Sequence, residues 1–472
     1  MASVEPIPPH ETDAVEGLGP DDIRTAENHF QRSFVAAVRE ALETSDRERL
    51  VGLTDALYVS ELAELITVLD KEERPQLIEL VGSDFDFAVL TEVDEQVRVD
   101  ILNELPLPLI ADGFVELESD DAVYILEDLP DDKQADILRR VPTLDRLALQ
   151  RALDYPEESA GRRMQSNFIA VPPFWTVGRA IDYMRESDDL PDDFNDLFVV
   201  DPGYRLQGYV RLNRLLRSRR PVPIQSIMED VQEIEAETDQ EEAAFTMQKY
   251  DLTSAAVVDR GGRLVGILTV DDIVDVVQEE AEEDIRALAG VGDEEVSDSV
   301  RAIARSRLPW LCVNLATAIL ASMVIGLFDA TLEQMVALAI LMLIVASMGG
   351  NAGTQTMTVA VRAIATHDLD PYNIGRVVLR ETYVGLINGL AFAVLMAAVA
   401  IIWFGSAGLG LVIGTAMVVN MLAAALAGIL IPLALDKFGI DPAIASSVFV
   451  TTVTDVVGFF AFLGFAAVWF GF

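Results

Sequence analysis

Cysteine, lysine and histidine are scarce in this chain of 472 residues. Cys312 is the only cysteine, which excludes a disulfide framework and a thiolate metal site. The three histidines, at positions 10, 29 and 367, lie outside the long apolar segments. No nucleophile–base arrangement, P-loop or metalloprotease motif is present, and we do not expect an enzyme. The first thirty residues lack the basic start and apolar core of a cleavable signal peptide, which favours a cytoplasmic N-terminal domain.

Positive charge is also scarce, and the acidic charge is unevenly placed. The net charge is −43, of which residues 306–472, with eight acidic and five basic side chains, contribute −3. Residues 1–305 therefore carry −40, which predicts an acidic soluble assembly joined to an apolar membrane domain. Such a surface disfavours nucleic acid and anionic lipid and attracts dissolved cations. Because only four lysines occur, adaptation to a salty cytosol is an alternative source of the acidity, compatible with a functional one.

Five apolar segments follow residue 305, and a helix needs roughly 20 predominantly apolar residues to cross a bilayer. They run from Pro309 to Phe328, from about Leu332, from Thr382 to Phe404, from Leu409 to Leu435 and from Ile444 to Phe470. Basic residues precede the first span and lie between the second and third and between the fourth and fifth: Arg301, Arg305, Arg307, Arg362, Arg376, Arg380 and Lys437. Because cytoplasmic loops carry the excess of Lys and Arg, this pattern predicts five spans with the N-terminus inside and the C-terminus outside.

Polar side chains interrupt two of these spans. The apolar part of the second, residues 335–347, is too short to cross, so the span must continue through GGNAGTQT at 349–356. This stretch suits either helix–helix contact or a polar wall facing hydrated ions. Asp455 lies midway along the fifth span with no Lys, Arg or His in that segment, and a carboxylate at such depth costs from roughly 3 kcal/mol upward. We predict that it faces a water-filled ion path; a neutral carboxyl or a hydrogen bond to a neighbouring helix are the alternatives.

Two further oxygen-bearing residues accompany Asp455. Thr451 is one helical turn before it on the same face, where its hydroxyl and carbonyl could both address a hydrated cation. Asp441 precedes Pro442 at the predicted cytoplasmic end of the span, and Asp before Pro is also an ordinary helix start.

A ten-residue sequence occurs twice, 58 residues apart. VVDPGYRLQG at 199–208 and VVDRGGRLVG at 257–266 are identical at seven of ten positions. Each copy predicts a strand, a tight turn, a strand and a helix. The repeat resembles a tandem pair of CBS domains, which we place at 161–277; such pairs are regulatory modules, and many bind adenine nucleotides. Thr269 and Asp272 resemble their T-x-x-D contact to ribose and phosphate, so ATP is a candidate ligand there.

The remaining soluble residues predict helices. Residues 23–160 show helical periodicity with short polar breaks, which predicts an all-α superhelix, and residues 1–22 are expected to form a disordered tail. Acidic pairs such as Asp120 and Asp121 recur at the predicted helix ends, as solvated surface, helix starts or ion ligands.

Residues 278–305 predict an acidic helix that connects the soluble part to the first span. Glu279 and Glu283 are four residues apart, as are Glu280 and Asp284, so each pair shares a helix face. Such pairs repel in water unless a divalent cation binds between facing acids, and an exposed acidic linker is the alternative.

The whole arrangement resembles the MgtE family of magnesium channels. It consists of an acidic helical domain, a CBS pair, an acidic connecting helix and a membrane domain of five spans at 306–472. The segments YPEESAGRRM at 155–164, GGNAGTQ at 349–355 and TTVTD at 451–455 carry the resemblance together with that order, and it covers essentially residues 25–472. The family implies a homodimer in the cell membrane with its pore between the two membrane domains. It also implies cytosolic domains that sense Mg2+ and close the pore when the ion is plentiful.

The resemblance also implies roles for individual residues. Asp455 would be the pore carboxylate, Thr451 would offer its backbone carbonyl, and Asn351 and Gln355 lie in the matching polar segment. The sensor acids would be Glu241, Asp251, Asp272, Asp275, Glu280, Glu283, Asp284 and Asp441, with Asp120 and Asp121 in the helical domain. All are oxygen ligands, and Mg2+ prefers oxygen in octahedral geometry and gives up its water reluctantly.

We therefore expect a Mg2+-selective channel for magnesium uptake that Mg2+ itself closes. At low Mg2+ the −40 of charge would loosen the soluble assembly, and at high Mg2+ bridging ions would tighten it, because the ion binds the closed state better. A secondary transporter that couples Mg2+ or Co2+ to H+ or Na+ is one alternative, against which the lack of an inverted repeat weighs. A nucleotide-sensing regulatory membrane protein is the other.

Overall fold

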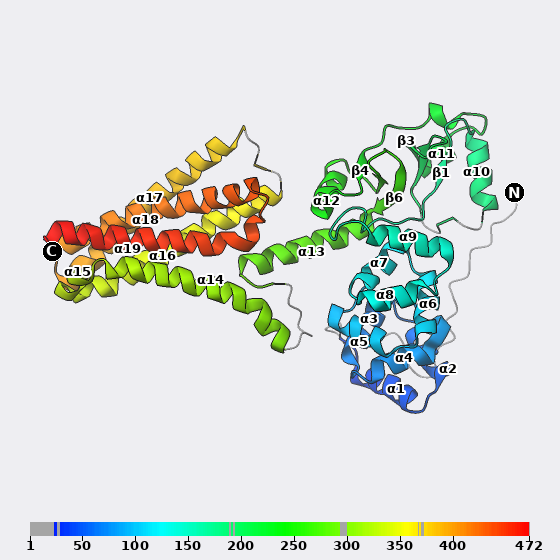
Figure 1. Cartoon of the computed structure of the whole chain (residues 1–472), viewed down its shortest axis with the longest axis horizontal. Coiled ribbons are helices and arrows are strands. Elements are labelled where there is room, and N and C mark those ends of the chain that lie inside the picture. The colour runs from blue at the N-terminus through cyan, green and yellow to red at the C-terminus, as the bar shows by residue number, and fades with distance from the viewer. Residues whose placement is uncertain are drawn as a thin grey trace. The chain divides into compact units, whose positions relative to one another are not determined.

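The computed structural model describes residues 23–25, 29–187, 190–191, 194–292, 300–366, 368–369 and 372–471. The chain divides into two compact units, Met1–Val277 and Gln278–Phe472 (Figure 1). The predicted tail at residues 1–22 lies outside the described residues.

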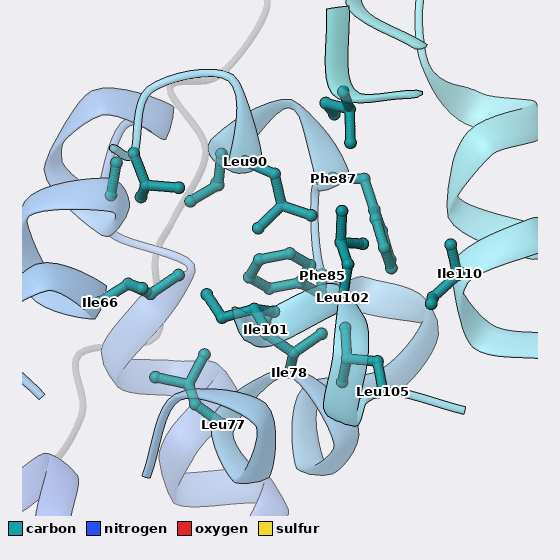
Figure 2. Packing of buried hydrophobic residues seen from close by; sticks show 14 of the residues in the cluster. Ile66, Leu77, Ile78, Phe85, Phe87, Leu90, Ile101, Leu102, Leu105 and Ile110 are labelled. Carbon is teal, nitrogen blue, oxygen red and sulfur yellow. The ribbon is translucent and has the colours of Figure 1, made fainter. Parts of the chain in front are cut away.

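Short helices that share one core form the first part of the first unit. They are α1 (Arg32–Glu43), α2 (Arg47–Thr54), α3 (Val59–Val68), α4 (Glu73–Val81), α5 (Glu95–Glu104), α6 (Leu107–Glu116), α7 (Ser119–Glu127), α8 (Asp131–Leu138) and α9 (Thr143–Leu153), with the 3-10 turns η2 (Gly82–Asp84) and η3 (Phe87–Leu90). Helices of this length are marginal alone in water, so packing stabilises them. Figure 2 shows part of the core, where Phe85 and Phe87 meet edge to face at 5.4 Å among aliphatic side chains such as Ile66 and Ile101. The predicted helical array is confirmed.

Two three-stranded sheets follow, one from each copy of the repeat. They have the orders β1-β2-β3 and β4-β5-β6, from Ala170–Val171, Asp196–Val200, Leu206–Arg211, Glu233–Glu235, Ser254–Val258 and Leu264–Thr269. In each sheet the first two strands are parallel and the last two antiparallel. The helices of this part are α10 (Val177–Glu186), α11 (Leu212–Arg217), η4 (Ile224–Ser226), α12 (Gln240–Lys249) and α13 (Val270–Leu288). The predicted order of strand, turn, strand and helix is confirmed in both copies.

The two copies also share their turn chemistry and register. Asp201 Oδ1 accepts hydrogen bonds from the backbone N–H groups of Gly203 and Arg205, and Asp259 Oδ1 accepts the equivalent pair in the second copy. Both sheets shift register by one residue at the same place, after Val199 and after Val257. These matches explain why the ten-residue repeat is visible in the sequence.

The second unit is a bundle of long helices (Figure 1). It contains α14 (Val300–Gly326), α15 (Asp329–Gln334), α16 (Val336–Ala365), α17 (Ile374–Phe404), α18 (Ala407–Lys437) and α19 (Pro442–Phe470). All except α15 are long and apolar enough to cross a membrane, which agrees with the five predicted spans. Helix α18 packs against α16, α17 and α19, and side chains such as Met417, Val345 and Phe462 form the core between them.

The predicted connecting helix at 278–305 corresponds in its first part to α13, and residues 293–299 of that range lie outside the described residues. Helix α13 begins at Val270, as the last helix of the second repeat copy, and ends at Leu288. Gly290, with φ of +71°, turns the chain just beyond it, in a conformation that costs glycine little. Helix α14 begins at Val300 and contains Pro309, which the sequence placed at the start of the span; neighbouring helices and solvent make such a proline tolerable.

Candidate ion path and acidic contacts

Helices α16 and α19 approach each other closely at Gly353. A Cβ added there would lie 2.6 Å from Val450 Cγ1 and 3.4 Å from Thr454 Cγ2, both on α19. The first distance is below van der Waals contact, so a residue without a side chain is required at this crossing.

A second close approach lies about one turn away along α16 and includes α18. The side chain of Asn420 on α18 points between α16 and α19: a Cβ added at Gly349 would lie 2.1 Å from its Nδ2 atom, and one at Gly458 2.8 Å from the same atom. Gly349 is therefore level with Gly458, while Gly353 is level with residues 450–454. Helices α16 and α19 run antiparallel along this seam.

These two contact points set the level of the predicted ion-path residues. Asn351 lies between the two glycines of α16, and Asp455 lies between the two contact points on α19, so both are at one height in the bundle. Asp455 is half-buried. Asn351 and Gln355 are exposed within the described chain, as are Thr354 and Thr358, so α16 presents a polar stripe at this height.

Thr451 is more engaged by its own helix than the sequence suggested. It is half-buried, and its Oγ1 donates to the Ser447 carbonyl at 2.9 Å. Its own carbonyl oxygen accepts a hydrogen bond from Thr454 Oγ1, also at 2.9 Å. The hydroxyl of Thr451 therefore offers lone pairs but no proton, and a carbonyl oxygen with two lone pairs keeps limited capacity for a further partner.

The C-terminal end of α13 packs on the helices that carry these residues. Ala287 lies in one hydrophobic cluster with Met357 and Val361 of α16 and Ala443 of α19. A cavity of about 90 Å³ beside it is lined by Glu283, Ala287, Gly290, Val291, Gly292, Trp310 and Ile444. The end of α13 is thus placed where α16 ends and α19 begins.

Two acids lie close together at the same place. Asp441 is the N-cap of α19, and its Oδ1 accepts a hydrogen bond from the backbone N–H of Ala443 at 2.7 Å. Asp284 on α13 is half-buried, and burial first and the charge of Asp441 second raise its pKa above the ordinary value. Asp441 therefore has the expected capping role, and the charge of this capping carboxylate also raises the pKa of Asp284.

A second group of acids joins the helical array to the CBS pair within the first unit. Asp120, in the first turn of α7, is 8% exposed, and its Oδ1 has no hydrogen-bond partner. Burial, and after it the charge of Asp272, raises the pKa of Asp120 well above its usual range. Asp121 is affected by the same two causes in the same order, which raise its pKa to about 7.

Hydrogen bonds hold these acids in place. Gln165 Nε2 donates to Glu118 Oε2 at 2.6 Å and to Asp272 Oδ2 at 3.3 Å, so it joins α7 to the second repeat copy. The backbone N–H of Ser166 donates to Ser119 Oγ at 2.7 Å. Residues far apart in the sequence thereby bring Asp120 and Asp272 together.

These contacts occupy the predicted nucleotide motif. Thr269 Oγ1 donates to Asp272, whose other neighbours are Gln165 and Asp120. A cavity of about 370 Å³ lies instead between the two copies, lined among others by Asn195, Asp196, Tyr209, Arg211, Asp251 and Ser254. Asp196 and Ser254 are equivalent positions of the repeat, and Ser254 Oγ donates to Asp196 Oδ2 at 2.6 Å.

The structure places the other predicted sensor acids on α12, on α13 and at the cavity between the copies. Glu241 lies in the first turn of α12, Asp251 lines the cavity between the copies, and Asp275 is exposed on α13. Glu280 lies on α13, half-buried. Within the part of the chain that the structure describes, no three His, Cys, Asp or Glu side chains are placed to hold one metal ion. Mg2+ usually keeps several waters and takes one or two carboxylates, so pairs such as Asp120 and Asp272 still fit it.

Asn420 and Glu381 are among the buried polar residues of the membrane unit that were not predicted. Asn420 is 1% exposed, and Glu381 on α17 is 9% exposed beside Arg380, whose Nη2 is 3.1 Å from Glu381 Oε1. The only sequence signal for Asn420 is that it is, with Thr415, one of two polar residues in the apolar run from 409 to 435, and that signal does not say what it contacts.

Comparisons with known proteins cover both units. The family model for MgtE, a divalent cation transporter, matches residues 342–465, the MgtE intracellular N domain matches 57–158, and the CBS domain matches 160–220 and 224–279. The magnesium transporter MgtE of Thermus thermophilus is 32% identical over 446 residues, which are 93% of this chain and 96% of that protein. That of Enterococcus faecalis is 31% identical over 435 residues, 92% of this chain and 96% of that protein.

Solved structures match the soluble part. The crystal structure of the soluble part of a magnesium transporter is 27% identical with a TM-score of 0.48, covering 53% of this chain and 98% of that one. The cytosolic domain of the Mg2+ channel MgtE in complex with ATP is 28% identical with a TM-score of 0.48, covering 51% of this chain and 99% of that one.

Proposed function

We propose that this chain, which belongs to the MgtE family, is a Mg2+-selective channel that mediates magnesium uptake across the cell membrane. The observation that carries the proposal is the polar level of the bundle, where Asn351 and Asp455 lie at one height between two glycine contacts. A carboxylate at membrane depth without a basic residue in its span calls for a cation as its partner.

The chemistry of the polar level suits a hydrated Mg2+ ion. Mg2+ gives up its water reluctantly, so a path for it should hold the water shell with oxygen groups rather than strip it. Carboxylate, amide and hydroxyl groups from Asp455, Asn351, Gln355 and Thr451 supply such acceptors. Imidazole and thiolate, which suit softer metals, are lacking from the five spans apart from the exposed Cys312.

A second copy of the chain would complete this site. One Asp455 carries a single negative charge against the two positive charges of Mg2+, and the polar stripe of α16 is exposed in the single chain. A polar stripe facing lipid is costly, whereas facing a water-filled path between two copies satisfies it. Helix α14, of whose span only 6% is buried against 44% for α18, leaves room for a partner or lipid. The proposal includes a homodimer with the N-terminus and CBS pair cytoplasmic and the C-terminus outside.

Gating by Mg2+ follows from the two pairs of acids. Asp120 lies against Asp272, and Asp284 lies near Asp441, so ionising both members of either pair places like charges side by side. A Mg2+ ion bound between the members of a pair reverses the sign of that interaction and stabilises the contact. Because the ion then binds the docked state better than the open one, high cytosolic Mg2+ closes the channel. The second pair, Asp284 and Asp441, lies where the end of α13 packs on α16 and α19, the two helices that carry the ion-path residues.

Ion flux into liposomes containing the purified full-length protein tests the channel. We expect Asp455→Ala to lower Mg2+ flux more than about tenfold, the effect of losing roughly 1.4 kcal/mol or more of interaction with the ion. Asp436→Ala is the matched control, since Asp436 is exposed near the end of α18, and it should leave the flux unchanged. Normal Mg2+ flux in the Asp455 variant would exclude this ion path.

Two other assays separate the alternative functions. Single-channel currents well above the turnover of a carrier would favour a channel over an ion-coupled transporter.

For a nucleotide-sensing role, the cavity between the repeat copies has the volume of a small-molecule site, unlike the covered Thr269 and Asp272. We expect any ATP binding, measured by equilibrium dialysis, to weaken in Arg211→Ala and not in Arg217→Ala, which lies outside that cavity. ATP binding without any ion flux would favour the regulatory alternative.

A further inference from the structure

Asn420 is a buried polar side chain of the membrane unit that the ion path does not itself use. It lies near the middle of α18 and is 1% exposed. Its Nδ2 donates a hydrogen bond to the Val345 carbonyl of α16 at 2.8 Å. Among the described side chains, its Oδ1 is one of the few buried polar atoms with no hydrogen-bond partner.

The orientation of this amide is determined by its partner. A backbone carbonyl accepts hydrogen bonds and donates none, so the NH2 group of Asn420 must face Val345. The oxygen is then left in an apolar interior, where an unsatisfied polar group costs about 1–3 kcal/mol. A leucine of similar volume would avoid that cost. The amide therefore fills this space at a higher free energy than a leucine would.

The amide sits where the two ion-path helices are closest. Gly349 of α16 and Gly458 of α19 leave the space that it enters, and no larger residue fits at either position without a shift. Gly349 is two residues before Asn351, and Gly458 is three residues after Asp455. One side chain thus touches both helices within one turn of their predicted ion-path residues.

We propose that Asn420 is a positioning residue that holds Asn351 and Asp455 at one height along the ion path, an inference that rests on the proposed function. Its hydrogen bond to Val345 joins α18 to α16 at a single peptide, and its contact with Gly458 places α19 against the same point. Apolar side chains fix the register of α16 on α18 by shape alone, whereas a hydrogen bond also fixes it by direction. A slip of one residue moves a side chain by about 1.5 Å along the helix, enough to separate two groups that share one hydrated ion.

The first test replaces Asn420 by leucine in the full-length protein. We expect Asn420→Leu to insert and fold, to raise the half-saturating Mg2+ concentration about tenfold, and to lower the ratio of Mg2+ flux to Mn2+ flux. A merely structural role would reduce the amount of folded protein without changing that ratio per folded molecule. Asn388→Leu is the matched control, because Asn388 is exposed in the middle of α17, and it should change neither quantity.

A double variant separates positioning from space-filling. Asn420→Ala frees the space that the added Cβ of Gly349→Ala needs, so the pair refills the junction without the hydrogen bond. We expect this variant to fold and still to show the lowered flux ratio. The parental ratio and half-saturation in either variant would overturn the proposal, and so would failure of both to fold, since Asn420 would then act on stability alone. Asp455→Ala decides the ion path separately: if it abolishes flux while the Asn420 variants behave as the parent, only this inference fails.

Discussion

Asp284 near the end of α13 and Asp441 at the start of α19 lie close enough that the charge of Asp441, after burial, raises the pKa of Asp284. The hydrogen bond from the Ala443 N–H holds the Asp441 side chain in place as a helix cap, so the Asp441 carboxylate cannot rotate away from Asp284 without losing that bond. A divalent cation between them removes the repulsion. The packed end of α13 is therefore a contact whose stability depends on Mg2+ under the proposed gating.

Neutralising the acidic end of α13 should weaken closure. We expect the combined variant Glu280→Gln, Glu283→Gln and Asp284→Asn to need a higher Mg2+ concentration to halve the channel's open probability, by about tenfold or more. The reason is that the acids that bind the ion in the docked state are lost. Single-channel recording at graded cytosolic Mg2+ measures that concentration. The variant Glu282→Gln, at an exposed position of the same helix, controls for the loss of an acidic charge. An unchanged Mg2+ dependence in the triple variant would contradict the gating mechanism.

The acids around Asp120 predict a pH dependence of stability without Mg2+. Burial first and Asp272 second raise the pKa of Asp121 from its ordinary 3.8 to about 7. A carboxyl whose pKa is higher in the folded protein binds its proton more readily there, so folding stability falls as pH rises through that range. In Mg2+-free buffer we expect the soluble part of the full-length protein to unfold at a higher temperature at pH 6 than at pH 8.

Substitution at Asp121 checks the assignment. Asp121→Asn should reduce the difference between pH 6 and pH 8 and raise the unfolding temperature at pH 8. Asp112→Asn, at an exposed position of α6, should leave the pH profile unchanged. A parental profile in the Asp121 variant would show that other groups cause the pH dependence.

The crossing of α16 and α19 should not tolerate a side chain at Gly353. Gly353→Ala places a Cβ 2.6 Å from Val450 Cγ1, and overpacking of this kind costs about 1–3 kcal/mol. We expect a lower unfolding temperature and reduced Mg2+ flux in liposomes. Gly350→Ala is the control on the same helix, since no atom lies within 4 Å of its added Cβ. Equal behaviour of the two variants would mean that the helices can separate without cost.

The helical array should depend on one buried arginine. Arg98 is 2% exposed; its Nε donates to Asp128 Oδ2 at 2.6 Å, and its Nη1 donates to the carbonyls of Leu90 and Val93. Arg98→Leu leaves these acceptors without their donor, and breaking such a buried pair costs about 3–5 kcal/mol. Chemical denaturation of the soluble part measures the loss.

An exposed arginine of the same array provides the comparison. Arg139 pairs with Asp136 at the surface, where an ion pair contributes about 0–1 kcal/mol. Arg139→Leu should therefore change the denaturation midpoint little. If the two variants lose the same stability, the burial of Arg98 is not what matters.

The five spans and the repeat could be predicted because each depends on local sequence. A run of apolar residues long enough to cross a bilayer can be recognised from the sequence alone. The turns that contain Asp and Gly recur because the side chain of each Asp accepts a hydrogen bond from the backbone of its own turn. The end of α13 could not be predicted as well. Its acidic pairs continue the helical pattern, whereas the turn at Gly290 depends on a backbone conformation that composition does not reveal.

The candidate sites divide in the same way. Asp455 stands out in the sequence because a charge midway along an apolar span is costly. What faces it depends on which residues of other helices reach the same height, and that height follows from the contacts at Gly349, Gly353 and Gly458. Asn420 was missed because the sequence does not show which group an asparagine in an apolar run contacts.

The sequence alone determined that this chain has an acidic soluble part, a duplicated module and five apolar spans, since charge, repetition and hydropathy are properties of the residues themselves. The tertiary structure decided that Asp120 meets Asp272, that Asp284 meets Asp441, and that Asn420 joins the helices beside Asp455. The physical reason is that electrostatic and packing energies depend on distances between atoms, and for residues far apart in the chain only the fold sets those distances.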